Sequence, residues 1–267
     1  MQKTIILILT LALLLSASLF IGVQTTGAII VPAENSWAAK APMHEARSNL
    51  GVAGVNGKIY AIGGISVPSV VDFKAITTLP LASEPKDVGT NEEYDPSTNT
   101  WSSKAVMPVA RSDFAVAVVQ NKIYCIGGMV GWENLPVNEV YDPAKNSWET
   151  KASLPTPEEG MQANVVNGKI YVIGGGANYV YNPAVDNWTA MTSMQNTPNG
   201  TQSSCVYGNK IYVVCSPCIQ IYNPENDSWT TGIQIPVVLT QPIAVATSGL
   251  DAPARIYVFL ARDTRNF

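Results

Sequence analysis

Two arginines stand at equivalent places in a repeating pattern, twelve residues before the isoleucine of a recurring Ile-Tyr step. Polar residues take the same place in the next two copies, and the four positions in chain order are Arg47, Arg111, Glu158 and Asn199. A serine follows each arginine, Ser48 and Ser112. A planar guanidinium donates two parallel hydrogen bonds to a carboxylate or sulfate, so contact with a ligand is one prediction. The alternative is that each arginine bonds the backbone or a carboxylate of a neighbouring repeat.

Residues suited to catalysis or metal binding are few. The single histidine, His44, cannot build a multi-histidine copper or zinc site, and a Ser-His-Asp set would have to pass through it. Neighbouring carboxylates such as Glu92 and Glu93 face opposite sides of a strand, which makes them a poor acid/base pair. We therefore predict no catalytic residue, no metal and no cofactor.

The cysteines favour structure over redox catalysis. Cys215 and Cys218 have the Cys-x-x-Cys spacing, but they follow an apolar strand rather than a helix N-terminus that would lower a thiol pKa. A structural disulfide is the prediction, either within this pair or from one of its members to Cys205. Weak metal binding ranks below both arrangements, and the pairing is not readable from spacing.

The N-terminus and the charge balance bound the compartment and the partners. Lys3 precedes an apolar run from Ile5 to Val23, which predicts that residues 1–28 form a secretory signal or, alternatively, an N-terminal membrane anchor. Either way the rest of the chain is expected to be secreted or on the cell surface, with membrane contact only through an uncleaved N-terminus. The net charge of −4 argues against nucleic acid, which requires a basic surface.

A composite pattern recurs along the chain, and such recurrence indicates stacked units that bury one another's apolar faces. An Ile-Tyr strand leads to a glycine doublet in three copies: Gly63-Gly64, Gly127-Gly128 and Gly174-Gly175. A Tyr-Asp/Asn-Pro corner follows in four copies, beginning at Tyr94, Tyr141, Tyr181 and Tyr222. Seven residues after each corner tyrosine stands a tryptophan: Trp101, Trp148, Trp188 and Trp229.

Each repeat predicts four antiparallel strands. An apolar strand leads into a two-residue polar turn such as Asn56-Gly57, where asparagine and glycine tolerate positive φ. The Ile-Tyr strand is continuously apolar, as expected of a strand buried on both faces. The corner supplies a third strand and a turn, and the tryptophan begins the outer strand. Four such strands make a propeller blade. The predicted full blades are 43–104, 105–151, 152–191 and 192–232.

The glycine doublet, the tyrosine and the spaced tryptophan resemble the kelch family of β-propellers, which shares the galactose oxidase-like fold, and the resemblance covers about residues 29–260. The fourth copy departs from it, with Cys215-Ser216 in place of the glycines. Residues 29–267 are thus identified as an all-β kelch-type propeller that lacks the copper site of galactose oxidase. Five blades are expected: residues 29–42, which include Trp37, would supply the outer strands of a closing blade and 233–267 its inner strands. The alternative is a truncated six- or seven-bladed ring.

The resemblance also implies where a ligand binds. In kelch-like propellers, residues placed like the four polar positions above rim the channel on the face that carries variable loops. The longest loop here, Ile65 to Thr90, contains Phe73, and a second loop, Met129 to Asn138, contains the off-pattern Trp132. We expect a non-catalytic, monomeric recognition module that binds an extracellular protein or a surface glycan there. The alternative is a sugar-modifying enzyme, similar to a sialate isomerase, that uses rim arginines and carboxylates.

Overall fold

The computed structural model describes residues 37–66, 84–157, 160–194, 202–215, 218–235, 243–246 and 256–259. The chain divides into two contact units, Met1–Ala39 and Lys40–Phe267. Every strand lies in the second unit, which is described by itself below. Within the described ranges no helix is long and apolar enough to cross a membrane.

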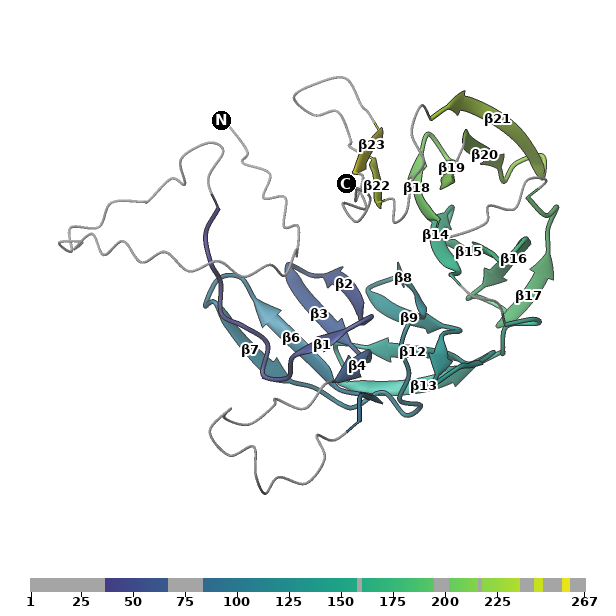
Figure 1. The fold of residues 1–267 in the computed structure, drawn as a ribbon. Helices are drawn as coiled ribbons and strands as arrows, with labels where there is room; N and C mark the ends of the chain where they lie inside the picture. The colour runs from purple at the N-terminus through teal and green to yellow at the C-terminus, as the bar shows by residue number, and fades with distance from the viewer. Residues whose placement is uncertain are drawn as a thin grey trace. The chain divides into compact units, whose positions relative to one another are not determined.

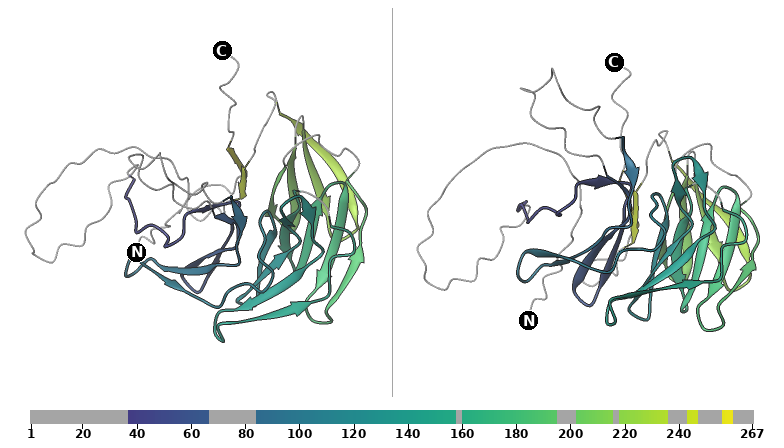
Figure 2. Two further views of the ribbon diagram at one scale, coloured as in Figure 1. Left: turned by 60° about the horizontal axis from the view of Figure 1, so that its bottom comes forward. Right: turned by 90° about the horizontal axis from the view of Figure 1, so that it is seen from below.

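Four sheets of four antiparallel strands follow one another along the chain (Figures 1 and 2). The first contains β2 (Gly51–Val55), β3 (Lys58–Ile62), β6 (Asn91–Asp95) and β7 (Thr100–Ser103). The second contains β8 (Ala115–Val119), β9 (Lys122–Ile126), β12 (Asn138–Asp142) and β13 (Ser147–Lys151). The third contains β14 (Gln162–Val166), β15 (Lys169–Gly174), β16 (Ala177–Asn182) and β17 (Asn187–Ala190). The fourth contains β18 (Ser203–Tyr207), β19 (Lys210–Cys215), β20 (Cys218–Asn223) and β21 (Ser228–Gln234). The prediction of four-stranded antiparallel blades is confirmed.

The hairpin between the first two strands of each sheet has the predicted turn chemistry. Both turn residues have positive φ in all four sheets, as the type I′ turn requires: Asn56-Gly57, Gln120-Asn121, Asn167-Gly168 and Gly208-Asn209. In β2 buried and exposed residues alternate, whereas β9 and β15 are almost continuously buried. The turns therefore fix the register, and the burial of β9 and β15 fits strands that lie between two neighbouring sheets.

The hydrophobic core lies between successive sheets. One buried cluster joins the first sheet to the second, around Tyr60 and Ile123, and another joins the second to the third, around Tyr124 and Ile170. A third cluster joins the third and fourth sheets, around Tyr171 and Ile211. The first strands contact one another in the order β2, β8, β14, β18, so no sheet buries its apolar faces alone.

A repeated latch joins the outer strand of each sheet to the segment that enters that sheet. It is built on an asparagine or aspartate two residues before the outer tryptophan, always at positive φ: Asn99, Asn146, Asp186 and Asp227. Its side-chain oxygen accepts one hydrogen bond from the corner tyrosine hydroxyl. It accepts another from a backbone N–H of the entering segment, in Ala41, Ala105, Ala152 or Thr192. The tryptophan Nε1–H donates to the carbonyl of that same residue at 2.7–2.8 Å.

The structure describes the inner strands of the predicted closing blade but not most of the N-terminal segment that would supply its outer strands. The inner pair is present as a two-stranded hairpin, β22 (Ile243–Ala246) and β23 (Ile256–Phe259). It contacts β18, and the backbone N–H of Ala244 donates to Ser203 Oγ at 3.0 Å. Residues 29–36 lie outside the described ranges, and residues 37–42 form no strand. Trp37 is 85% exposed, and the outer strands of the closing blade stay a prediction.

The third glycine doublet is displaced by one residue from its predicted position. Gly63-Gly64 and Gly127-Gly128 have positive φ, as expected, but in the third sheet the positive-φ pair is Gly175-Gly176. Gly174 belongs to β15, where it pairs with Ala177. The reason is loop length: β15 and β16 are joined by a tight two-residue turn, and the turn itself requires the two glycines.

Candidate functional site

Arg111, predicted to rim the channel, lies inside the frame of the second sheet. Its side chain is fully buried, and its guanidinium donates to the carbonyls of Gly127, Cys125 and Val109 at 2.8–2.9 Å. It also forms a buried ion pair with Glu139 in β12. All of its nitrogens are therefore committed to its own sheet, and no ligand can reach them.

Arg47 makes a similar but smaller set of contacts in the first sheet, since its Nε has no hydrogen-bond partner among the described residues. Its side chain is 0% exposed and donates to the carbonyls of Thr90 and Ala61 and to Glu92 Oε2, at 2.9–3.0 Å. Burial lowers the pKa of Arg47, while the charges of Glu92 and Glu45 oppose that shift. We call each buried arginine, with its carbonyls and its glutamate, a clamp.

The clamps correct the prediction that Arg47 and Arg111 bind a ligand, because both guanidinium groups are closed to solvent and donate to backbone carbonyls and a buried glutamate of the fold. Ser112 is also buried and pairs with Met129 through the backbone, so it is not a ligand residue either. Ser48, in β1 (Arg47–Ser48), is exposed. The remaining predicted residues Phe73, Glu158 and Asn199 lie outside the described ranges.

Sequence reasoning missed the glutamates of the clamps, although a signal exists. Glu92 and Glu139 both stand two residues before a corner tyrosine, in the two repeats that carry an arginine. In the third and fourth repeats, which lack the arginine, Tyr179 and Gln220 take that place. The arginine and the glutamate thus occur together or not at all along this one chain.

The glycine doublets let the Arg-Ser segments cross close above the sheets. A Cβ at Gly64 would lie 2.5 Å from the carbonyl oxygen of Ser48, and one at Gly128 would lie 2.6 Å from that of Ser112. The residue after each serine, Asn49 or Asp113, has a positive φ of 53° or 54°. These two segments lie side by side, with Asp113 N–H donating to the Asn49 carbonyl at 3.1 Å. The frame thereby projects Asn49 and Asp113 at one edge of the first two sheets.

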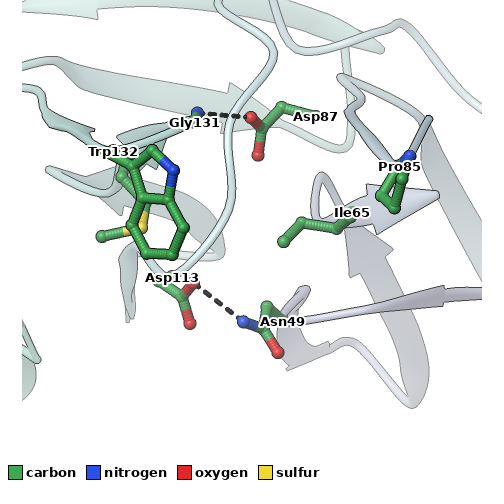
Figure 3. A pocket seen from close by; sticks show the side chains of 8 residues that line it. Asn49, Ile65, Pro85, Asp87, Asp113, Gly131 and Trp132 are labelled. Carbon is green, nitrogen blue, oxygen red and sulfur yellow. Dashed lines mark hydrogen bonds between the residues drawn. The ribbon is translucent and has the colours of Figure 1, made fainter. Parts of the chain in front are cut away.

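A pocket of about 300 Å³ opens beside Asn49 and Asp113 (Figure 3). It lies between two short elements of the loop face: the sheet of β1, β4 (Ile65–Ser66) and β5 (Lys86–Asp87), and the hairpin of β10 (Met129–Val130) and β11 (Glu133–Asn134). Eight residues line it: Asn49, Ile65, Pro85, Asp87, Asp113, Met129, Gly131 and Trp132. Both loops that were expected to carry recognition contribute to it.

Hydrogen bonds hold the pocket open between the two sheets. Asn49 Nδ2 donates to Asp113 Oδ2 at 2.9 Å, and the Gly131 N–H donates to Asp87 Oδ2 at 2.8 Å. The other oxygen of Asp87 is buried without a hydrogen-bond partner among the described residues. Trp132 stands on one side and is 98% exposed, which makes it the most exposed large apolar side chain in the described part of the chain. The pocket is therefore lined by two carboxylates and bounded on one side by an exposed aromatic ring.

The described residues offer little for metal or redox chemistry. They contain no group of three or more His, Cys, Asp or Glu side chains that could hold a metal ion. All four cysteines are buried free thiols, so the predicted disulfide among Cys205, Cys215 and Cys218 is absent from this structure. Cys215 pairs with Cys218 across β19 and β20, and burial raises the pKa of Cys215 to about 11, which disfavours the reactive thiolate.

Comparison with known proteins identifies the family. A family model described as FKB95, Kelch-repeats domain, matches residues 90–235, more than half of the chain. This chain belongs to the kelch-repeat family. Kelch-like protein 15 of Danio rerio is 34% identical over 95 residues, and Kelch-like protein 28 of Homo sapiens is 32% identical over 100 residues. These matches cover 36% and 38% of the kelch chain but only 14% and 16% of the relatives' own lengths.

A solved structure extends the likeness over most of the kelch fold. The structure titled "Structure of YjhT" matches with a TM-score of 0.67 and covers 86% of each chain. Its sequence identity is 13%, so it supports the fold alone. An influenza virus NS1A-binding protein homolog of Mus musculus is 36% identical over 90 residues, which cover 34% of this chain and 11% of the relative.

Proposed function

We propose that this kelch chain is a non-catalytic recognition module that binds a partner molecule over the pocket between its first two sheets. The observation that supports this most is the placement of Trp132, 98% exposed at the wall of a preformed pocket. Burial of an exposed indole against a partner releases free energy. Tryptophan is also enriched among the residues that contribute most to binding at protein interfaces. The prefolded hairpin that carries it adds little ordering cost on binding.

The partner class is an extracellular protein, with a surface glycan as the second candidate. The glycan is favoured by one observation: the exposed ring of Trp132 lies beside the amide of Asn49 and the carboxylate of Asp113, groups that suit stacking and hydrogen bonding to a sugar. The sugar-modifying enzyme is not proposed, because its rim arginines, Arg47 and Arg111, are committed to the clamps.

The proposal includes export of the chain and closure of the propeller ring. Residues 1–28 would export the chain or tether it to the surface, and residues 29–42 and 233–267 would together complete a fifth blade. Export brings the pocket to extracellular partners. Closure would pair the open edge of the β22–β23 hairpin, and an unpaired strand edge otherwise templates aggregation.

A binding screen tests the function. The full chain and its Trp132→Ala variant are exposed to a glycan panel and to surface proteins of the producing cells, with Tyr207→Ala as the control. Tyr207 is a 40% exposed aromatic beside the Gly208-Asn209 turn, at the opposite end of its sheet from the loop face. We expect a ligand that Trp132→Ala loses and Tyr207→Ala keeps. A folded wild type that binds nothing, or a ligand retained by Trp132→Ala, would contradict the proposal.

A further inference from the structure

The charge distribution of the pocket restricts what can enter it. Two of its eight lining residues are aspartates, and none of the eight is a lysine, arginine or histidine. Next to the lining residues in sequence stand the exposed Glu84 and Glu133, against one cation, Lys86. The charge of Lys86 helps to lower the pKa of Glu45, which does not line the pocket. The pocket is therefore negative on balance, and an anionic ligand would meet repulsion.

The hydrogen-bonding capacity of the two carboxylates is only partly used. Asp113 accepts from Asn49 through Oδ2, and Asp87 accepts from Gly131 through Oδ2. Asp87 Oδ1 has no partner among the described residues although it is buried. That oxygen is closed to solvent, so Asp87 offers a ligand its negative charge, whereas Asp113 is exposed and can also accept an N–H donor directly.

The apolar part of the pocket selects the shape of such a donor. Ile65, Pro85 and Met129 supply aliphatic surface, and the indole of Trp132 forms the wall (Figure 3). A long alkyl stem that ends in a cation matches this arrangement, since the stem packs on the aliphatic residues and the cation is attracted both by carboxylates and by an indole face. A sugar hydroxyl would satisfy the carboxylates but leave most of the aliphatic surface without a partner.

We infer that the pocket binds a lysine or arginine side chain of a protein partner, held between Asp87, Asp113 and Trp132. This inference rests on the proposed recognition function and names its ligand chemistry. The basic side chain would insert as a single anchor, while the rest of the partner would lie over the exposed β10–β11 hairpin.

A random heptapeptide library, panned on the full chain and counter-selected on Trp132→Ala, is the test. We expect enriched peptides to carry lysine or arginine at one position. Replacement of that residue by norleucine, which keeps the stem and removes the charge, should weaken binding about tenfold. Raising the salt concentration from 50 to 500 mM should weaken the basic peptide but not the norleucine peptide.

Two isosteric variants place the charge interaction in the pocket. Asp113→Asn removes the charge at a position of positive φ that asparagine tolerates, and it should weaken the basic peptide about fivefold while leaving the norleucine peptide unchanged. Asn49→Asp adds a charge at the equivalent position but replaces the donor to Asp113 Oδ2 by a second carboxylate, so it should strengthen the basic peptide by less than Asp113→Asn weakens it. Thermal unfolding of each variant reports whether the fold is intact.

The outcomes separate the inference from the proposed function. Peptides that depend on Trp132 but show no basic position, or that bind Asp113→Asn as tightly as the wild type, overturn the basic-ligand inference and leave recognition standing. Enrichment of no peptide, together with a glycan bound through Trp132, overturns the inference alone. The absence of any Trp132-dependent ligand, in this panning and in the surface screen, overturns both.

Discussion

The first two sheets and the next two share a backbone plan but are held together by different chemistry. In the first two, a buried arginine and a glutamate clamp the sheet, and the latch residue is a neutral asparagine, Asn99 or Asn146. In the third and fourth, no arginine stands at the clamp position, and the latch residue is an aspartate, Asp186 or Asp227. Charge is therefore buried at the loop edge of one half and placed near the outer surface of the other.

This difference coincides with the position of the candidate site. The pocket lies on the two clamped sheets, where the segments that contain Arg47 and Arg111 also carry Asn49 and Asp113. Each clamp fixes the backbone two residues before a side chain that lines the pocket. The clamps thus fix the backbone that carries two of the pocket residues, while their own buried groups do not line the pocket.

The largest expected effect is the loss of a clamp. Arg111→Met removes the cation and leaves Glu139 buried and unpaired, so the free energy of unfolding should fall by about 3–5 kcal/mol. Denaturant unfolding followed by tryptophan fluorescence measures it. The double variant Arg111→Met/Glu139→Gln, which removes both charges, should recover a large part of that loss. Equal destabilisation of the single and double variants would mean that the ion pair does not hold the sheet.

A middle-sized effect separates the two kinds of latch. Tyr181→Phe removes a hydroxyl that donates to the carboxylate of Asp186, and Tyr141→Phe removes one that donates to the amide of Asn146. Both tyrosines are fully buried, so their packing environments are comparable. Hydrogen bonds to charged groups are stronger, and we expect losses of about 1.5–3 kcal/mol for Tyr181→Phe and 0.5–1.5 kcal/mol for Tyr141→Phe in denaturant unfolding. The reverse order would contradict the distinction.

The smallest effect is a pH dependence confined to the aspartate latches. The Tyr181 hydroxyl and the Ala152 N–H lower the pKa of Asp186. Burial raises the pKa of Asp227, but bonds from Tyr222 and Thr192 outweigh it and the net shift is downward. A carboxyl with a lowered folded-state pKa stabilises the fold above its unfolded pKa, about 3.9 for aspartate, and loses that contribution as the pH falls through the folded value.

Low pH should therefore weaken the latches of the third and fourth sheets by protonating their aspartates. The latches of the first two sheets should not respond, because Asn99 and Asn146 do not titrate. The loss of stability between pH 5 and pH 2 should be about 1 kcal/mol smaller in Asp186→Asn/Asp227→Asn than in the wild type. Denaturant midpoints at a series of pH values measure this difference. Parallel curves for the two proteins would show that the latches do not contribute to acid sensitivity.

Local chemistry made most of the frame predictable. Turn residues, apolar strands and corner tyrosines act within a few positions of one another, so their spacing alone predicts four-stranded units. The clamps depend on register instead: Glu92 pairs with Ala61 and Glu139 with Cys125, which brings each carboxylate to the carbonyl that the arginine also bonds. An arginine that looks available in the sequence is buried because a strand about 30 residues or more later supplies its partner.

The pocket was predictable only in part for a similar reason. Trp132 stood out because it breaks the tryptophan spacing, and both contributing loops were expected on one face. Asp87 and Asp113 gave no pattern of their own, since they line the pocket from two separate segments: Asp87 from β5, and Asp113 from the segment that crosses over Gly128. The shift of the third doublet to Gly175-Gly176 shows the same limit, because two adjacent glycine pairs are indistinguishable until the turn length is known.

The direction of the latches bears on how the chain can be built during synthesis. Each tryptophan bonds a residue that precedes it by 60, 43, 36 or 37 positions, so its partner has always been made already. A sheet leaving the ribosome can therefore close its own latch at once, without waiting for later sequence. Growth from the N-terminus adds one stabilised layer at a time, and a nascent chain paused between layers exposes one unfinished face.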